Sequence, residues 1–236
     1  MPLSVRITKR LMDILISSLA LIILSPLLVL IAIAIKLDSP GRVLYTQRRM
    51  KQYKSFEFGS PFNIEEVDTF LLFKFRTMYS NAEARTGAVN AIENDPRVTR
   101  VGSVLRSMRI DEIPNLINVL FGQLSIVGPR ADRVEIYQEV EQEFPIVWER
   151  TRFVKPGITG LAQLALRSDG SLNGDNFLTS ILPESDMGSP VLSFRYKMYY
   201  DFAYQLKLSK FWSFLITDIK ILLKTPGVMF IHKNVI

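Results

Sequence analysis

A predominantly apolar run of 22 residues, from Ile14 to Ile35, constrains this chain more than any other feature of its sequence. As a continuous helix it would be about 33 Å long, enough to cross the roughly 30 Å hydrocarbon layer of a bilayer. Ser25-Pro26 lies near its middle, and a proline lacks an N–H and crowds the carbonyl four residues earlier, here that of Ile22. The run therefore predicts a membrane helix with a break near its midpoint.

Basic residues flank this run on both sides: Arg6, Lys9 and Arg10 before it, and Lys36, Arg42, Arg48 and Arg49 after it. Because Lys and Arg collect on the cytoplasmic side of a membrane helix, both ends favour the same side. A re-entrant hairpin, which enters one leaflet as helix, break and helix and then returns, satisfies the charges and the proline. The carbonyls freed at the break then need partners such as the Ser25 hydroxyl. A proline-kinked transmembrane helix, a signal anchor and a buried core helix are the alternatives.

Composition limits what the rest of the chain can be. Of 236 residues, roughly 200 lie outside the membrane segment, which is the size of one ordinary domain. No second segment is apolar enough for a full span, so a polytopic transporter is excluded. The net charge of +6 suits an anionic lipid surface, phosphorylated substrates or nucleic acid, and the membrane segment favours the first two over nucleic acid.

The chain has no cysteine and one histidine, His232. These counts exclude disulfides and thiolate chemistry, and argue against a histidine-based metal site or catalytic triad. The chemistry must therefore come from carboxylates, lysines, arginines or hydroxyls.

Local patterns predict the main elements of the remaining chain. They are a basic juxtamembrane stretch or solvated loop at 42–54, a surface loop at 56–70, a strand at 71–75, helices at about 99–108 and 111–121, and a long loop at 167–190. In the helix predicted at 211–224, Ser213, Thr217, Lys220 and Lys224 form one polar stripe among apolar residues. This pattern is typical of a helix lying in the membrane interface, and a helix packed in the core is the alternative.

Six arginines and no lysine occur between residues 97 and 133: Arg97, Arg100, Arg106, Arg109, Arg130 and Arg133. Guanidinium groups bind phosphate oxygens through two parallel hydrogen bonds, which an ammonium group cannot do. The cluster therefore suggests phosphate binding, although a surface ion pair explains any single arginine equally well.

Asp111-Glu112 stands within this arginine-rich segment, directly before the predicted helix 111–121. The simple interpretation is helix capping by Asp111. The alternative is catalytic, because an aspartate carboxylate can attack a phosphoryl group and form an acyl phosphate. Asp111 and Glu112 could together hold Mg²⁺, which usually binds to one or two carboxylates and substrate phosphates.

Three weaker motifs surround this pair. Gly128-Pro129-Arg130 predicts a rigid turn that presents Arg130, and Lys155 to Gly160 is a second Pro-Gly turn with a structural explanation. In the alternating segment 73–78, Lys74 and Arg76 would share one face of a strand.

Together and in this order, the motifs resemble those of the bacterial sugar transferases, the monotopic phosphoglycosyl transferases, over nearly the whole chain. They are Lys9-Arg10 with Asp13, Ser25-Pro26, Phe73 to Met78, Asp95-Pro96-Arg97, Asp111-Glu112-Ile113-Pro114, Val127 to Arg130, Lys155 to Gly160, Tyr200-Asp201, Tyr204, and Thr217 to Thr225. The resemblance implies a predominantly helical α+β protein of the cytoplasmic face of the bacterial inner membrane. Residues 1–40 would form the re-entrant hairpin, and 41–236 a compact catalytic domain with an amphipathic C-terminal helix.

The resemblance also implies a reaction. Such enzymes transfer sugar 1-phosphate from a nucleotide diphosphate sugar, usually a UDP-sugar, to a polyprenyl phosphate such as undecaprenyl phosphate. They release UMP, use Mg²⁺ and begin a surface polysaccharide or glycoconjugate. The aspartate of the Asp-Glu pair forms a covalent phosphosugar intermediate, and Asp111 takes this role here with Glu112 as its partner acid. Arg130 corresponds to an arginine near the phosphate, and Lys74, Arg76, Arg109, Pro129 and Asp201 are further substrate-binding candidates.

One departure from the family pattern lies beside Arg130. The family usually has Gly-Pro-Arg-Pro where this chain has Gly128-Pro129-Arg130-Ala131, which loosens the turn and puts nucleotide contacts there in question. A non-enzymatic peripheral membrane-binding module and an inactive family member are the alternatives. The sugar, the polyprenol length, the glycan pathway and the oligomeric state, including a homodimer, are not encoded in any residue pattern.

Overall fold

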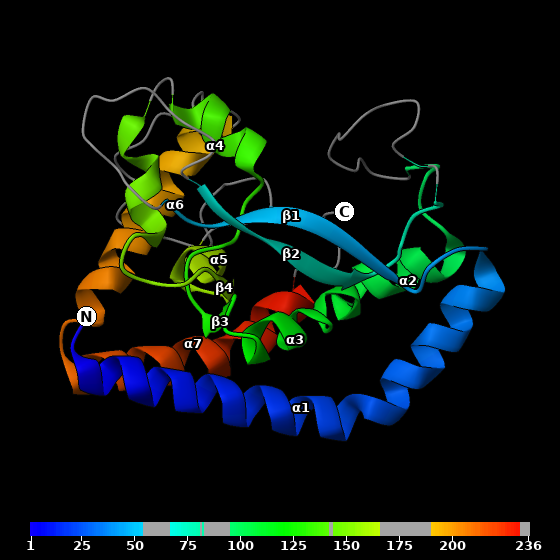
Figure 1. The fold of residues 1–236 in the computed structure, drawn as a ribbon, viewed down its shortest axis with the longest axis horizontal. Helices are drawn as coiled ribbons and strands as arrows, with labels where there is room; N and C mark the ends of the chain where they lie inside the picture. The colour runs from blue at the N-terminus through cyan, green and yellow to red at the C-terminus, as the bar shows by residue number, and fades with distance from the viewer. Residues whose placement is uncertain (54–66, 81, 83–94, 142–143, 166–189, 232–236) are drawn as a thin grey trace.

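A computed structural model of the chain describes residues 1–53, 67–80, 82, 95–141, 144–165 and 190–231. A long bent helix, α1 (Leu3–Asp38), lies along one side of the molecule, and the strands and shorter helices lie above it (Figure 1). The other elements, with η for a 3₁₀ helix, are β1 (Leu44–Tyr53), β2 (Val67–Phe75), α2 (Arg100–Ser107), η2 (Ile110–Glu112), α3 (Asn115–Leu120), β3 (Ser125–Val127), α4 (Val134–Glu141), η3 (Pro145–Thr151), β4 (Gly157–Thr159), α5 (Leu161–Ala165), α6 (Pro190–Lys207) and α7 (Phe211–Ile231). The predicted α+β, predominantly helical class is confirmed.

The predicted break at Ser25-Pro26 is a bend within a continuous helix. Pro26 lies inside α1, and the ribbon turns upward in the second half of the helix (Figure 1). The Ser25 hydroxyl donates a 2.8 Å hydrogen bond to the Ile22 carbonyl, which Pro26 cannot bond because it has no N–H. This bond supplies the predicted partner and lets the helix continue, so the interrupted helix–break–helix form is corrected to a kinked helix.

The outer surface of α1 suits a lipid environment. The helix is long and apolar enough to cross a membrane, and only 11% of its most apolar window is buried. Leu15, Ile22 and Leu30 each leave more than 60% of their surface exposed. The re-entrant topology itself stays a prediction.

The inner surface of the first arm of α1 is fixed to the rest of the domain. Its buried residues recur every fourth position: Val5, Lys9, Asp13 and Ser17. Lys9 forms a buried ion pair with Asp218 of α7, with 2.7 Å between Nζ and Oδ2. The Asp13 carboxylate accepts hydrogen bonds from the Ser125 hydroxyl and the Ile126 N–H at the start of β3. The main core lies directly above, between this arm, β2, α3, β3 and α7.

A twisted antiparallel hairpin of β1 and β2 crosses the molecule above α1 (Figure 1). Its register runs from Leu44 opposite Phe75 to Tyr53 opposite Val67, with an irregularity between Met50 and Gln52. The predicted strand at 71–75 is confirmed, and it begins earlier, at Val67.

The prediction of a juxtamembrane stretch or loop at 42–54 was wrong for residues 44–53, which form β1. The segment Leu44–Tyr53 is mostly polar and shows little apolar alternation, so its strand character comes from pairing with β2 and not from its own pattern. Residues 56–66 of the predicted loop 56–70 and residues 167–189 of the predicted loop 167–190 lie outside the described residues.

The two predicted helices after residue 98 are confirmed, with changed limits. Thr99 caps α2, since its side chain accepts a 3.0 Å hydrogen bond from the Gly102 N–H. The second helix, α3, begins only at Asn115 and ends before Gly122, which has a positive φ of 72°. The residues between α2 and α3 form the tight turn η2.

The two Pro-Gly turns of the sequence pack against each other. Strands β3 and β4 pair in parallel, and the Gly128 N–H donates a 2.8 Å hydrogen bond to the Thr159 carbonyl. A Cβ atom on Gly157 would overlap the Gly128 nitrogen, so this close approach requires glycine. The turn at 155–160 therefore supports the turn that carries Arg130.

Helix α7 has one buried face and one exposed face, so the core alternative holds for the buried face, and contact of the exposed face with a membrane stays a prediction. Phe214, Asp218 and Ile221 face the interior and are at most 2% exposed. Its opposite face exposes Trp212, Ile216, Ile219 and Leu223 together with Lys220 and Lys224. Because α7 lies next to the first arm of α1 (Figure 1), the exposed apolar surfaces of both helices occur in the same part of the molecule.

Candidate active site

Asp111 and Glu112 lie in η2, where the chain turns from α2 into α3. The residue that caps α3 is Pro114, and no side chain makes a capping hydrogen bond there. The capping interpretation of Asp111 was therefore wrong. The turn presents both carboxyl groups while α2 and α3 hold its two ends.

One carboxylate oxygen of Glu112 contacts cations from two other elements. Its Oε1 accepts a 2.6 Å hydrogen bond from Lys74 on β2 and lies 3.4 Å from Nη2 of Arg130, which follows β3. Burial alone would raise the pKa of Glu112, but the charges of Lys74 and Arg130 outweigh it and hold this pKa well below its usual value. Glu112 therefore stays ionised at any physiological pH.

The pKa of Asp111 is shifted in the direction opposite to that of Glu112. It is partly buried and makes no hydrogen bond or ion pair with any residue that the structure describes. Burial, followed by the neighbouring charge of Glu112, raises its pKa to about 6, although Lys74, Arg106 and Arg109 oppose this shift. Two adjacent carboxyl groups thus have widely separated pKa values, and the one without a partner is the more basic.

Arg109 adopts an unusual backbone conformation next to the pair. Its φ of 57° is the only positive value for a non-glycine residue in the described ranges. Such a conformation costs about 1–3 kcal/mol and persists where the surrounding structure imposes it. The guanidinium also lowers the pKa of both Asp111 and Glu112, so its charge acts on the site.

The segment that carries Arg130 is tied down on both sides. The Pro129 carbonyl accepts a 2.7 Å hydrogen bond from the Gly157 N–H. On the other side, the Ala131 carbonyl accepts a 3.1 Å hydrogen bond from Nη1 of Arg49, and Ala131 itself is buried. These bonds hold the turn in place with alanine at the position where the resembled family usually has proline.

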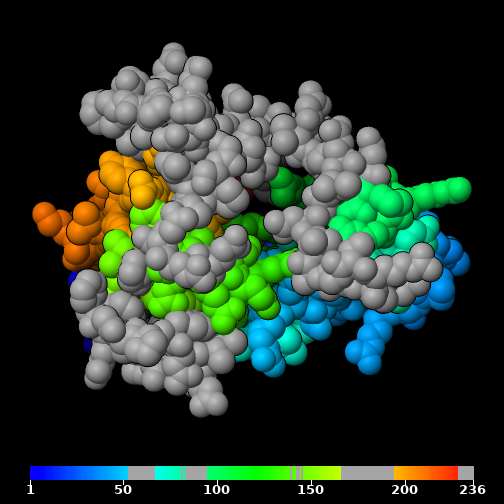
Figure 2. Space-filling model, turned by 90° about the horizontal axis from the view of Figure 1, so that it is seen from above, coloured from blue at the N-terminus to red at the C-terminus, as the bar shows by residue number. Residues whose placement is uncertain are grey.

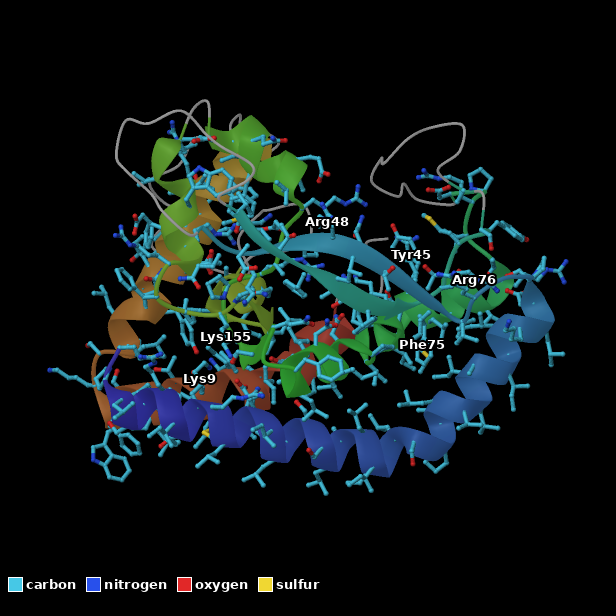
Figure 3. The ribbon with its side chains drawn as sticks, in the orientation of Figure 1. Lys9, Tyr45, Arg48, Phe75, Arg76 and Lys155 are labelled. Atoms are coloured by element: carbon cyan, nitrogen blue, oxygen red, sulfur yellow. The ribbon has the colours of Figure 1, made fainter. Side chains whose placement is uncertain are left out.

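The structure brings together Lys74, Asp111, Glu112, Pro129 and Arg130, with Arg109 beside them, but it separates two other predicted substrate-binding residues from this group. Arg76 donates hydrogen bonds to the carbonyls of Ile35, Ser39 and Pro40 and so caps the end of α1, where Figure 3 places it. Asp201 is 1% exposed and accepts a 2.7 Å hydrogen bond from the buried Arg150. In this structure both side chains are therefore buried and make contacts within the protein.

Sequence reasoning missed Arg49 and the buried group around Arg150. Arg49 lies close enough to Arg130 and Glu112 to interact with their charges, and burial, followed by Arg130, lowers its pKa to about 10. Arg150 joins Asp132 to Asp201, at 3.1 Å and 2.7 Å, and so fixes the residue two positions after Arg130. For Arg49, the available signal is the Arg48-Arg49 pair, which the sequence places among the basic residues that follow the apolar run.

The face opposite α1 is hollowed. Viewed from above, the space-filling surface has a hollow near its centre (Figure 2). Nearby, η2 contacts both α2 and β2.

The carboxylates fit one mode of Mg²⁺ binding. Among the described residues, no three His, Cys, Asp or Glu side chains form a metal-binding group, so a cage made of protein ligands alone does not exist there. Asp111 and Glu112 fit the sparser mode, in which one or two carboxylates and substrate phosphates hold the ion.

Comparison with known proteins identifies the family. The sequence profile of the bacterial sugar transferases matches residues 4–232. The chain belongs to this family. The predicted family and its transferase class are therefore confirmed.

Several curated proteins are similar to this bacterial sugar transferase. The exopolysaccharide production protein PSS of Rhizobium leguminosarum bv. phaseoli is 37% identical over 165 residues, which cover 67% of this chain and 74% of that protein. The UDP-glucose:undecaprenyl-phosphate glucose-1-phosphate transferase of Klebsiella pneumoniae is 43% identical over 159 residues, and the UDP-N-acetylgalactosamine-undecaprenyl-phosphate N-acetylgalactosaminephosphotransferase of Aeromonas hydrophila is 40% identical over 156. Each match covers 66% of this chain but only 30% and 33%, respectively, of those two longer proteins.

Proposed function

We propose that this bacterial sugar transferase moves a sugar 1-phosphate from a UDP-sugar to undecaprenyl phosphate at the cytoplasmic face of the inner membrane. The observation that carries the proposal is the state of Asp111, a carboxyl group that has no partner among the described residues and has a raised pKa, beside an ionised Glu112 paired with Lys74 and Arg130. A nucleophile needs a free oxygen atom and an electropositive setting, and Lys74, Arg109 and Arg130 supply that setting.

In the first step, an Asp111 oxygen attacks the phosphorus atom that bears the sugar. A bond forms between this oxygen and phosphorus, the bond from phosphorus to the bridging oxygen of the diphosphate breaks, and UMP leaves with its electron pair. The product is an acyl phosphate between Asp111 and the sugar phosphate. Negative charge on the transferring phosphoryl oxygens would be stabilised by the cations of this site.

In the second step, a phosphate oxygen of undecaprenyl phosphate attacks the same phosphorus atom. The bond from phosphorus to Asp111 breaks, the carboxylate is restored and undecaprenyl diphosphate sugar is released. Glu112 keeps Lys74 and Arg130 in place through both steps because it stays ionised. Mg²⁺, held by Asp111, Glu112 and the diphosphate, would neutralise charge on the donor and on departing UMP.

The names of the relatives support the choice of acceptor more than the choice of sugar. The Klebsiella protein is named for glucose and the Aeromonas protein for N-acetylgalactosamine, and both names contain undecaprenyl phosphate. The Rhizobium protein is named for exopolysaccharide production. We therefore assign the chain to the first membrane step of a surface glycan and assign no sugar.

The reaction is tested directly by UMP release. Purified protein in lipid nanodiscs is incubated with Mg²⁺, undecaprenyl phosphate and each of a panel of UDP-sugars. We expect UMP with at least one donor, at a rate that depends on undecaprenyl phosphate, and reversal by excess UMP. No UMP with any donor, together with retained lipid binding, would favour the non-enzymatic membrane module.

The hairpin topology has a separate test. Because the chain lacks cysteine, a single cysteine can be introduced after Lys36 and another before Arg6 without background labelling. If α1 returns to the cytoplasmic side, a membrane-impermeant thiol reagent will label both only in inverted vesicles. Labelling of the two positions from opposite sides would establish a transmembrane helix instead.

The pH dependence follows from the two carboxyl groups. Since the nucleophile must be ionised and the pKa of Asp111 is raised to about 6, we expect kcat/KM to fall as the pH drops through this value, to about a tenth at pH 5. Glu112→Gln should move this acidic fall in kcat/KM to lower pH, because the Glu112 charge raises the pKa of Asp111. A wild-type fall near the ordinary aspartate value of about 4 would contradict the assignment.

A further inference from the structure

A second, separate pocket lies beside the N-terminal end of α1. It encloses about 470 Å³ between the first turns of this helix and the segment Val154-Lys155. That volume is within the range of small-ligand sites, about 300–1,000 Å³. None of the candidate active-site residues lines it. Lys9 and Lys155 lie at this end of α1, away from Phe75 and Arg76 at the other end (Figure 3).

The pocket has an excess of positive charge. Four cationic side chains line it, Arg6, Lys9, Arg10 and Lys155, against the single carboxylate of Asp13. Lys9 is neutralised by Asp218, and Asp13 is occupied by hydrogen bonds from β3. At least two positive charges therefore have no counterion among the lining residues.

Among the described residues, two of these cationic side chains have no partner. Arg10 donates hydrogen bonds of 2.6 and 2.7 Å to the last carbonyls of α3. The side chains of Arg6 and Lys155 make no hydrogen bond or ion pair within the described part of the chain. Burial, followed by the charge of Arg10, lowers the pKa of Lys155, and an anion placed between these groups would oppose this shift.

The remaining lining is apolar and continuous with the outer surface of α1. Leu3, Ile7 and Leu11 recur every fourth residue and are 69%, 52% and 54% exposed. Phe153, which precedes the segment Val154-Lys155, is 61% exposed. A free phosphate ion would use only the cations, whereas a lipid would also cover these apolar side chains.

We propose that this pocket binds one anionic bilayer phospholipid, with its phosphate between Arg6, Arg10 and Lys155 and an acyl chain along Leu3, Ile7 and Leu11. Guanidinium groups suit phosphate oxygens, and Arg10 is already oriented by the end of α3. The bound lipid would fix the first arm of α1 at the level of the headgroups. The site is independent of the phosphoryl-transfer reaction.

The test compares lipid retention in two matched variants. Protein in an uncharged detergent is titrated with short-chain phosphatidylglycerol or phosphatidylcholine, and bound lipid is counted by native mass spectrometry. We expect one phosphatidylglycerol per wild-type chain and an affinity about 30-fold weaker in Arg6→Gln/Lys155→Gln, roughly fivefold for each charge. The control, Arg42→Gln/Arg48→Gln, removes two exposed charges after α1 and should bind like wild type.

Further measurements distinguish a loss of charge from a loss of folding, and binding of phosphatidylglycerol from binding of undecaprenyl phosphate. Arg6→Lys/Lys155→Arg keeps both charges and should bind phosphatidylglycerol within a few fold of wild type. Equal losses of affinity in both Gln variants would mean that only the total charge of the protein matters. Equal binding of phosphatidylcholine, whose phosphate is offset by choline, would exclude a site that selects anionic lipids. Displacement of the bound lipid by inorganic phosphate would also overturn the proposal. So would a variant Arg6→Gln/Lys155→Gln that has a raised KM for undecaprenyl phosphate but unchanged binding of phosphatidylglycerol.

Discussion

Asp111→Asn is expected to reduce kcat/KM for UMP release by about 10⁴-fold or more, because an amide cannot form the acyl phosphate. The covalent step can be isolated by omitting undecaprenyl phosphate and supplying a donor with a radiolabelled sugar. Wild-type protein should then retain up to one label per chain, and the variant none. Label retained by Asp111→Asn, or turnover near the wild-type rate, would show that another group is the nucleophile.

Asp111→Glu provides the matched control for this loss. It keeps a carboxylate but moves it by one methylene, so a decrease of about 10²-fold is expected, since displacement of a reacting group by about 1 Å has effects of this size. Neither variant should unfold the protein. The Asp111 side chain has no hydrogen-bond partner among the described residues, and the neutral Asn also removes like-charge repulsion with Glu112, so the thermal midpoint should stay equal or rise.

Lys9→Met is expected to produce the largest loss of stability, about 3–5 kcal/mol, because it leaves the carboxylate of Asp218 buried without its cation. Lys9 and Asp218 are only 6% and 2% exposed, so water cannot replace the missing partner. Chemical denaturation in detergent micelles measures the free energy of unfolding. Lys210→Met, at an exposed lysine, should change it by less than about 0.5 kcal/mol.

The double variant Lys9→Met/Asp218→Asn tests the origin of this loss. It removes both charges and keeps a side chain that can accept the 2.8 Å hydrogen bond from the Tyr204 hydroxyl. Its free energy of unfolding should lie well above that of Lys9→Met and near the wild-type value. A double variant as unstable as the sum of the two single variants would mean that the pair contributes no interaction energy.

The sequence predicts those helix limits that are set by neighbouring residues in the chain. The limits of α2 follow from Thr99 as its cap, and the end of α3 follows from Gly122. The importance of Asp111-Glu112 could likewise be recognised from a short motif and its arginine-rich setting.

Other features depend on contacts between distant residues and could not be read from a local pattern. Lys9 and Asp218 are 209 positions apart, so neither residue reveals in the sequence that it is paired. The strand β1 is mostly polar and forms because β2 lies beside it. Arg76 alternates with Lys74 along the chain, but it follows the last residue of β2 and turns toward the end of α1.

The kinked helix α1 is attached to the domain at both ends, and this restricts how its length can change. Lys9 and Asp13 fix the first arm, while Ile31 and Ile35 pack against Phe75 and Leu105 at the other end. One residue inserted between the two attachments would rotate one arm by about 100° relative to the other and turn its buried face toward lipid. Viable insertions and deletions in this helix should therefore come as whole turns. The domain that packs on α1, as well as bilayer thickness, sets the length of the helix.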